Sequence, residues 1–234
     1  MLTLSLDTST PAGSLAVLNE EKVIGVISTA SEETYSSRMF RHLEFLLGEL
    51  SLAADKFDLY AVSAGPGSFT GLRVGLTAAK GWAEVYRKPI AAVSSLEAVA
   101  AQARSTADLL VPVLDARRGE IYFGFYRRTR KGVALEGEEC SMTPGEFVDL
   151  VRERMSKEGL VIVTPVPEVL DSWMSRNETA DVPIESVSGV LAPMIGQIGL
   201  ARAKRGETVD ALHLDANYVR RSDAELKWKR PERA

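Results

Sequence analysis

Residues 65–71 read Gly-Pro-Gly-Ser-Phe-Thr-Gly, and the prediction of the fold starts from this loop. A short apolar run at residues 59–64 precedes the loop, and an apolar helical pattern at residues 71–86 follows it. A buried strand, a glycine-rich loop and a helix in this order are typical of α/β folds that hold an anion at the helix start. The loop lacks the Gly-Lys-Ser/Thr ending of a Walker loop and the Gly-x-Gly-x-x-Gly spacing of a dinucleotide site.

Two interpretations of the loop stay open at this point. Its backbone N–H groups, next to the positive end of a helix dipole, can hold a phosphate or a carboxylate. The candidate anion or nucleotide site consists of Asp7, Thr8, Gly65, Gly67, Ser68 and Thr70. In the alternative, the loop is a tight crossover turn whose glycines supply unusual dihedrals, Ser68 or Thr70 caps the helix, and Asp7 caps a hairpin turn.

Hydrophobic periodicity predicts an α/β protein made of two related halves. The elements expected in the first half are strands at residues 2–7, 14–18, 23–28, 59–64 and 89–93 and helices at residues 36–50, 71–86 and 96–104. Those expected in the second half are strands at residues 109–114, 121–126 and 160–163 and helices at residues 144–155, 168–173 and 191–204. Strand, carboxylate, turn and strand occur at Asp7 and again at Asp115, where a turn cap is the favoured role. We therefore expect subdomains at residues 1–105 and 106–234.

The helix at residues 71–86 carries apolar or small residues on every face, although covering one side of a sheet needs a single stripe. Its Gly71, Gly75 and Ala79, at intervals of four, would let another helix approach closely. With the neighbouring amphipathic helix it predicts a protein–protein surface anchored by Phe40 and Trp82. The other candidates for this surface are Met39, Leu43, Gly71, Val74, Gly75 and Ala78. On this basis Gly75→Arg is expected to block association and leave the fold intact. The alternative is an ordinary, fully buried central helix.

Composition narrows the function classes. The chain has 234 residues, 45% of them hydrophobic, and a net charge of -4 from 28 Lys and Arg against 32 Asp and Glu. A single cysteine, Cys140, excludes an internal disulfide, and two distant histidines, His42 and His213, exclude a histidine-rich metal site. The acidic balance argues against a primary nucleic-acid surface, and the basic groups at residues 127–131 and 220–230 are expected to form a solvated face. No run of about 18 apolar residues and no secretory signal is evident, so a cytoplasmic, membrane-free protein is expected.

Four motifs together carry a family resemblance that spans nearly the whole chain. They are Asp7-Thr8-Ser9, the stretch at residues 65–75, the stretch from Asp115 to Tyr122, and Tyr218-Val219-Arg220. With these motifs the chain is similar to the TsaB family of bacterial tRNA threonylcarbamoyladenosine biosynthesis proteins. The resemblance implies the actin/sugar kinase/Hsp70-like (ASKHA) fold, with two duplicated RNase H-like subdomains and mixed sheets. It also implies a non-catalytic subunit that binds and activates TsaD, the enzyme that modifies adenosine 37 of tRNA, together with the ATPase TsaE.

The resemblance also implies what the chain lacks. TsaD holds a metal with two histidines four residues apart, and the matching positions here are Ser95 and Val99. We therefore expect no cofactor of its own, with ATP placed only at a complex interface, and an indirect or weak tRNA contact. A homodimer through the same two helices is a further expectation. The chain departs from the family pattern at Tyr35 and Arg41, next to or within the first helix. The competing hypothesis is a weak nucleotide-binding hydrolase or a peptidase-like enzyme of the same fold, although no nucleophile–base pair is evident.

Overall fold

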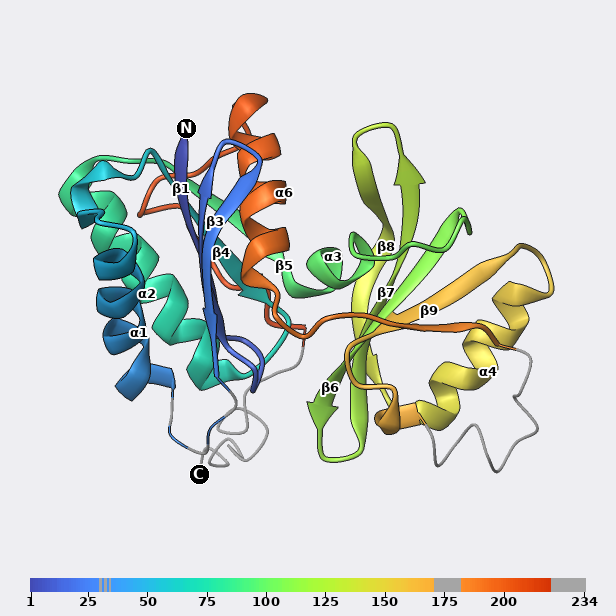
Figure 1. The fold of residues 1–234 in the computed structure, drawn as a ribbon. Helices are drawn as coiled ribbons and strands as arrows, with labels where there is room; N and C mark the ends of the chain where they lie inside the picture. The colour runs from blue at the N-terminus through green and yellow to red at the C-terminus, as the bar shows by residue number, and fades with distance from the viewer. Residues whose placement is uncertain (30, 32, 34, 171–181, 220–234) are drawn as a thin grey trace, which may run out of the picture.

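The computed structural model describes residues 1–29, 31, 33, 35–170 and 182–219. The chain folds into two halves that lie side by side, each built on a five-stranded sheet (Figure 1). The strands of the first sheet are β1 (Leu2–Asp7), β2 (Ser14–Asn19), β3 (Lys22–Ser28), β4 (Leu59–Gly65) and β5 (Ile90–Ser94). The strands of the second sheet are β6 (Leu109–Arg117), β7 (Glu120–Thr129), β8 (Gly132–Met142), β9 (Leu160–Thr164) and β10 (Ile184–Ser186). The helices are α1 (Tyr35–Glu49), η1 (Ala54–Lys56), α2 (Phe69–Tyr86), α3 (Ser95–Ala100), α4 (Pro144–Met155) and α6 (Ala192–Lys204).

Both sheets have the same topology. The spatial order is β3-β2-β1-β4-β5 in the first sheet and β8-β7-β6-β9-β10 in the second, so each half follows the order third, second, first, fourth, fifth. In each sheet the first three strands pair antiparallel, and the fourth and fifth strands continue the sheet in parallel. The duplication predicted from the repeated strand, carboxylate and turn is therefore confirmed.

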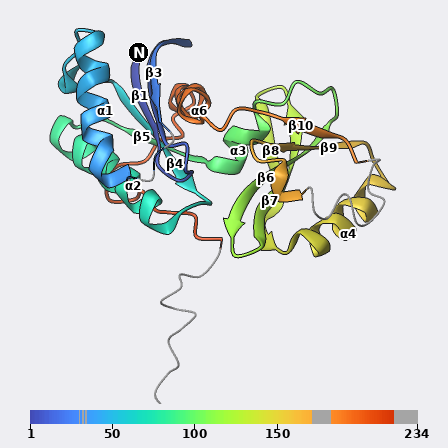
Figure 2. The same ribbon diagram turned by 60° about the horizontal axis from the view of Figure 1, so that its bottom comes forward.

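The elements stack in layers, as two views of the ribbon show (Figures 1 and 2). Helices α1 and α2 cover the face of the first sheet that points away from the second half, and α4 covers the far face of the second sheet. Helices α3 and α6 lie between the sheets. The apolar cluster there includes Leu59, Val93, Leu96, Ile195, Leu110 and Val163, which come from both halves. Because the halves share this core, burial of apolar surface holds them together.

Helix α6 belongs to the C-terminal part of the chain but packs on β1, β2 and β4 of the first sheet. Two glycines make this close approach feasible: a Cβ on Gly196 would lie 2.3 Å from Leu18 Cδ1, and one on Gly199 would lie 2.6 Å from Ala61 Cβ. The domain boundary expected after residue 105 stays a prediction. One face of the first sheet is nevertheless covered by α6, which follows that boundary in the chain.

Most of the predicted elements agree with the structure to within a few residues. Strands β8 and β10 were not predicted, because β8 is rich in charge and only partly buried, and β10 has three residues. The predicted helix at residues 168–173 lies partly outside the described residues. Among the residues that the structure describes, no helix is long and apolar enough to cross a membrane.

Candidate docking surface and glycine-rich loop

Helix α1 is amphipathic, and its two sides have different surroundings. Met39, Leu43 and Leu46 are buried in the core of the first half, as their spacing of three and four residues predicts. Phe40 lies on the flank of α1 that faces α2 and is 57% exposed. Its ring meets the indole of Trp82 edge to face, with 6.4 Å between the ring centroids. Sequence reasoning therefore identified both aromatic side chains at this helix pair.

Helix α2 begins at Phe69, where the Ser68 hydroxyl accepts a hydrogen bond from Gly71 N at 3.2 Å. This is the capping role that the sequence offered Ser68 as an alternative. The helix ends at Tyr86, and the C-cap residue Arg87 adopts the left-handed conformation. Near this end, Trp82 packs on the buried ring of Tyr60, with 5.7 Å between centroids. Trp82 therefore belongs partly to the core and partly to the surface.

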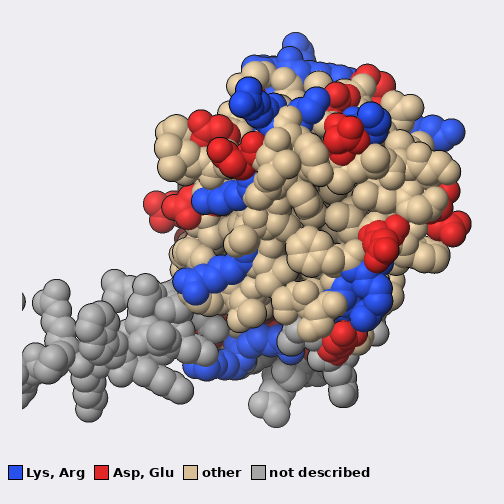
Figure 3. Space-filling model, turned by 90° about the vertical axis from the view of Figure 1, so that its left-hand side faces the viewer, with Lys and Arg blue, Asp and Glu red and all other residues tan. Residues whose placement is uncertain are grey.

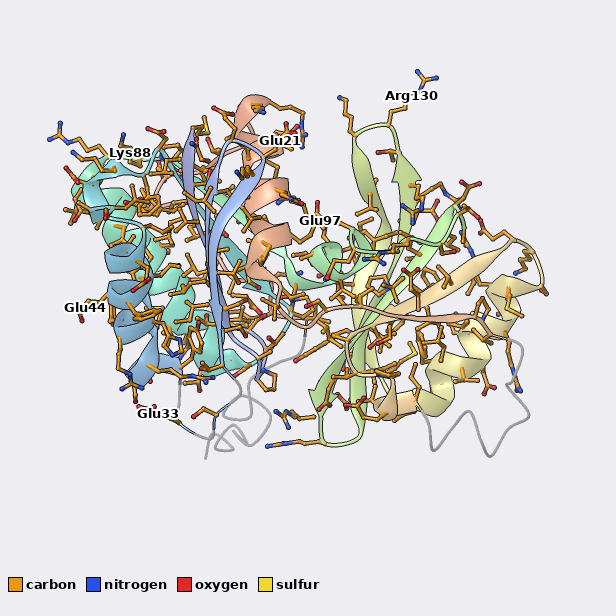
Figure 4. All side chains as sticks on the ribbon, in the orientation of Figure 1. Glu21, Glu33, Glu44, Lys88, Glu97 and Arg130 are labelled. Atoms are coloured by element: carbon orange, nitrogen blue, oxygen red, sulfur yellow. The ribbon has the colours of Figure 1, made fainter. Side chains whose placement is uncertain are left out.

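The outward side of α1 and α2 forms a surface that we call the outer helical face, defined by Phe40, Val74, Gly81, Trp82 and Val85. Phe40 and Val85 are 57% and 72% exposed, and the other three are exposed or half-buried. Figure 3 shows a broad uncharged area on this side of the molecule, with charged residues gathered around its margin. In Figure 4, the side chain of Glu44 extends outward from α1. An exposed apolar area with a charged rim is typical of a protein-binding surface.

The structure separates the residues predicted for this surface into two groups. Phe40, Val74 and Trp82 contribute exposed area, whereas Met39, Leu43 and Ala78 lie in the core. The prediction that Gly71 and Gly75 admit another helix is wrong. A Cβ on Gly71 would lie 1.9 Å from Thr8 O, and one on Gly75 would lie 2.4 Å from Thr8 Oγ1. These glycines admit the segment that follows β1, so Gly75→Arg would disrupt the fold. Phe45 and Val85, which are 61% and 72% exposed, were not predicted as surface residues. Phe45 lies outside the buried stripe of Met39, Leu43 and Leu46, which is the signal that could have found it.

The glycine-rich loop closes on the chain itself. Ser68 N donates to Ser9 O at 2.8 Å, and Thr8 Oγ1 donates to Gly71 O at 2.7 Å. A Cβ on Gly67 would lie 2.6 Å from Ser9 O. The structure thus brings the predicted residues Thr8, Gly67 and Ser68 together with Asp7, but residues 8 and 9 fill the space beside the loop. The backbone donor of Ser68 that a phosphate would use is already taken.

Asp7 has no exposed surface and lies in a network of hydroxyl groups. Its carboxylate accepts hydrogen bonds from Ser9 N at 2.8 Å, Ser9 Oγ at 2.5 Å and Thr10 Oγ1 at 2.9 Å. Ser9 Oγ lies 3.0 Å from Ser95 Oγ, which lies 2.7 Å from Ser63 Oγ. Burial raises the pKa of the Asp7 carboxyl above its ordinary value, and the hydrogen bonds oppose that rise. The geometry is that of a buried turn cap.

The C-terminal segment covers the other side of the loop. Asn217 N donates to Ala64 O at 2.7 Å, and a Cβ on Gly65 would lie 2.8 Å from Asn217 O. The ring of Tyr218 packs against that of Phe69 in a tilted arrangement, with 5.1 Å between centroids. The motif residue Tyr218 therefore packs on the start of α2, whereas Val219 packs against the apolar cluster between the halves and Arg220 lies outside the described residues. The remaining predicted residue, Thr70, is exposed at the helix start.

A pocket of about 620 Å³ lies between the halves, lined by parts of α3, β7, β8, α6 and the C-terminal segment. Glu97 is 2.5 Å from Arg202 there, and its side chain points into the space between the halves in Figure 4. Ser94, Tyr126 and Asn217 all donate to the Glu139 carboxylate. Burial raises the pKa of both Glu97 and Glu139. The lining thus combines the carboxylates of Glu97, Glu138 and Glu139 with the guanidinium of Arg202. No sequence pattern indicated the pocket, because five separate segments form it.

Two arginines of the basic cluster at residues 127–131 form ion pairs or hydrogen bonds within the protein. Arg127 lies 2.5 Å from Glu136 and 2.8 Å from Glu158. Arg128 donates to the carbonyl oxygens of residues 103, 105 and 107. These two guanidinium groups therefore hold the second half together. The basic tail considered with them lies at residues 220–230, outside the described residues. Within the described part of the chain, no three His, Cys, Asp or Glu side chains are grouped so as to hold a metal ion.

Comparison with known proteins places these features in a family. The chain is 36% identical to the tRNA threonylcarbamoyladenosine biosynthesis protein TsaB of Haemophilus influenzae, over 97% of this chain and 95% of that protein. The chain belongs to the TsaB family. It is also 29% identical to TsaB of Bacillus subtilis, over 97% of this chain and 98% of that protein. The family model of TsaD, tRNA N6-adenosine threonylcarbamoyltransferase, matches residues 15–198, as a TsaB member related to that enzyme would.

A solved structure supports the same assignment. The chain resembles an uncharacterized Pseudomonas aeruginosa protein described as similar to the peptidase YeaZ, with a TM-score of 0.76 and 25% identity. The similarity covers 94% of this chain and 99% of that protein. Together with the two sheets of identical strand order, it confirms the predicted actin/sugar kinase/Hsp70-like fold for this TsaB-family chain.

Proposed function

We propose that this chain serves tRNA threonylcarbamoyladenosine biosynthesis as a non-catalytic subunit that binds and activates TsaD through the outer helical face. Membership of the TsaB family supports the pathway. The exposure of Phe40 and Val85 on two adjacent helices is the observation that carries the binding surface. Exposed large apolar side chains contribute most to binding when a partner excludes water from them.

The relation to the TsaD model supports the choice of partner. The match at residues 15–198 includes all of α1 and α2, so TsaD is expected to present an equivalent helix pair. Two related chains that meet through the same helices form a pseudo-twofold interface, in which each apolar face covers the other. The same geometry permits a homodimer of this chain when TsaD is absent.

The residue types at the positions discussed above support a non-catalytic role for this chain. Ser95 and Val99 stand where the resemblance places the metal-binding histidines of TsaD, and Ser95 is engaged with Ser9 and Ser63. Residues 8 and 9 occupy the space beside the glycine loop, and the pocket between the halves is lined by Glu97 and Glu139. We infer that any ATP in the assembly is bound at a complex interface or by TsaE, and that tRNA is held chiefly by the partner.

Binding of purified TsaD tests the proposal. Phe40→Glu and Val85→Glu each place a charge on the outer helical face and are expected to weaken binding at least about thirty-fold, equivalent to about 2 kcal/mol. Leu135→Glu makes the same chemical change on β8 of the second half, where Leu135 is 42% exposed, and should bind normally. Isothermal titration calorimetry measures the affinities, and circular dichroism checks folding. Normal binding by both folded variants on the outer helical face would refute the docking surface.

An activity assay separates binding from catalysis. Mixtures of TsaD, TsaE, ATP, threonylcarbamoyl donor and tRNA should form the modified nucleoside only when this chain is added. Phe40→Glu should lower that activation, and Leu135→Glu should retain it. Product formation by this chain without TsaD would show that it is an enzyme.

A further inference from the structure

A polar cluster lies on the inner side of α1, away from the outer helical face. Tyr35, Arg38 and His42 follow one another at intervals of three and four residues, which places them on the same side of the helix. Their exposed fractions are 8%, 3% and 8%. The Tyr35 ring lies against Gly13, where a Cβ would be 2.2 Å from Tyr35 Cε2. The cluster therefore joins the start of α1 to the turn between β1 and β2.

The guanidinium of Arg38 is buried without a carboxylate partner among the described residues. Its Nη1 donates to Thr29 O at 2.6 Å and to Thr29 Oγ1 at 2.8 Å, and its Nη2 donates to Pro11 O at 3.4 Å. Asp7 accepts its hydrogen bonds from Ser9 and Thr10, and Glu33 pairs with Arg41 at 2.8 Å. Since a buried charge is costly unless a counter-charge accompanies it, the positive charge of Arg38 calls for an anion.

Three buried polar atoms of this cluster lack a hydrogen-bond partner: Tyr35 Oη, Arg38 Nε and His42 Nδ1. Thr29 Oγ1 accepts from Arg38, so its hydrogen is directed elsewhere, and His42 Nε2 lies 3.5 Å from it. In the tautomer whose Nε2 accepts from Thr29, the neutral imidazole carries its proton on Nδ1. Burial and then the charge of Arg38 lower the pKa of His42, which keeps the ring neutral. In this tautomer all three unpaired atoms can donate a hydrogen bond, and buried polar atoms are rarely left unsatisfied.

We propose that Tyr35, Arg38 and His42 bind a small inorganic anion, with chloride as the ligand in a cell. The Arg38 guanidinium carbon lies 4.8 Å from the centroid of the Tyr35 ring, and the Tyr35 and His42 centroids are 6.1 Å apart. A monatomic anion accepts N–H and O–H donors from several directions and neutralises the guanidinium. Each of the three side chains is less than a tenth exposed, so a ligand bound among them would be enclosed, which favours a small anion over a large organic one. The bound anion would fasten α1 to the turn at Pro11, independently of the proposed partner.

A thermal unfolding experiment tests this anion site. Chloride replaces gluconate at constant ionic strength, and the unfolding midpoint is followed by circular dichroism. The unmodified chain should gain roughly 3–6 °C as chloride rises to saturation. Arg38→Met should give no chloride response, and Tyr35→Phe a smaller one. Arg41→Met removes an exposed arginine from the same helix and should respond like the unmodified chain. A midpoint of the unmodified chain that is independent of chloride would overturn the proposal.

A second measurement needs no variant and therefore holds even if Arg38→Met fails to fold. Crystals of the unmodified chain grown in bromide should show an anomalous peak within about 3.5 Å of Arg38 Nε. A water molecule without anomalous signal at this position would overturn the proposal as well.

Discussion

An aspartate lies at or near the end of the first strand of each half, yet the two carboxylates have opposite surroundings. Asp7, at the end of β1, is fully buried among Ser9 and Thr10, and the glycine loop folds over the residues that follow it. Asp115, near the end of β6, is exposed and accepts a hydrogen bond from Arg117 N at 2.7 Å. The turn cap predicted for Asp115 is confirmed. Identical topology thus supports a closed, buried turn in one half and an open turn in the other.

The outer helices of the two halves differ in the same way. Helices α1 and α2 present the uncharged outer helical face, whereas α4 carries Arg154, which lies 2.9 Å from Glu136 and 2.6 Å from Glu158. Hydrogen bonds from Arg127 hold the pKa of both glutamates below the ordinary range. A charged network of this kind favours contact of α4 with water. The uncharged outer helical face is suited to contact with a protein partner. Function on a duplicated fold therefore follows from surface residues, since the topology is shared.

The largest expected effect comes from Gly71→Ala. The added Cβ would lie 1.9 Å from Thr8 O, which is backbone and can move only if the turn after β1 moves. We expect a loss of about 3 kcal/mol in the free energy of unfolding, measured with urea. A loss below about 1 kcal/mol would contradict the closed packing of the loop on residue 8.

Replacing each of the two aspartates by alanine compares how much the two turns contribute to the free energy of unfolding. Asp7→Ala leaves the hydrogen-bond donors of Ser9 and Thr10 unsatisfied in a buried site and is expected to cost about 2 kcal/mol. Asp115→Ala removes an exposed cap and should cost less than about 0.5 kcal/mol. Urea unfolding of both variants checks the ranking, and equal losses would show that burial does not distinguish the two turns.

The burial of Asp7 also predicts a pH dependence. The folded pKa of Asp7 is raised above its ordinary value of 3.8, so between these two values the native state binds more protons than the unfolded state. The contribution of Asp7 to the free energy of unfolding should therefore increase as the pH falls through the folded pKa. Asp7→Asn removes this contribution, and the difference between the two stability curves isolates it. A difference of the opposite sign would mean that the hydrogen bonds outweigh burial.

The smallest effect is a gain in stability. Gly81 lies in the C-terminal half of α2 on the outer helical face, and a Cβ there would meet nothing within 4 Å. Gly81→Ala should stabilise the isolated chain by about 0.8 kcal/mol, since alanine favours an exposed helix over glycine. Thermal or urea unfolding measures the gain. A destabilised variant would show that α2 is not exposed at this residue when the chain is alone.

Periodicity and turn chemistry predicted most strands and helices, the duplication and the helix pair with Phe40 and Trp82. Contacts between distant segments could not be predicted in this way. Nothing in the spacing of Gly71 and Gly75 indicates that they face Thr8, because a helical pattern does not say which side meets the sheet. The pocket between the halves could not be predicted for a similar reason, since its lining comes from five separate segments. The Arg38 cluster was hidden because a charged residue within an amphipathic helix is normally exposed.

Photo-crosslinking tests the central claim, that the outer helical face binds TsaD, most directly. The photoreactive residue p-benzoylphenylalanine replaces Phe40 on α1 in one sample and Lys157, an exposed residue just after α4, in another. Each protein is mixed with TsaD and irradiated, and the products are identified by mass spectrometry. The account predicts a strong crosslink from position 40 to TsaD and none from position 157. A crosslink from position 157 alone would place the partner on the charged half and contradict it.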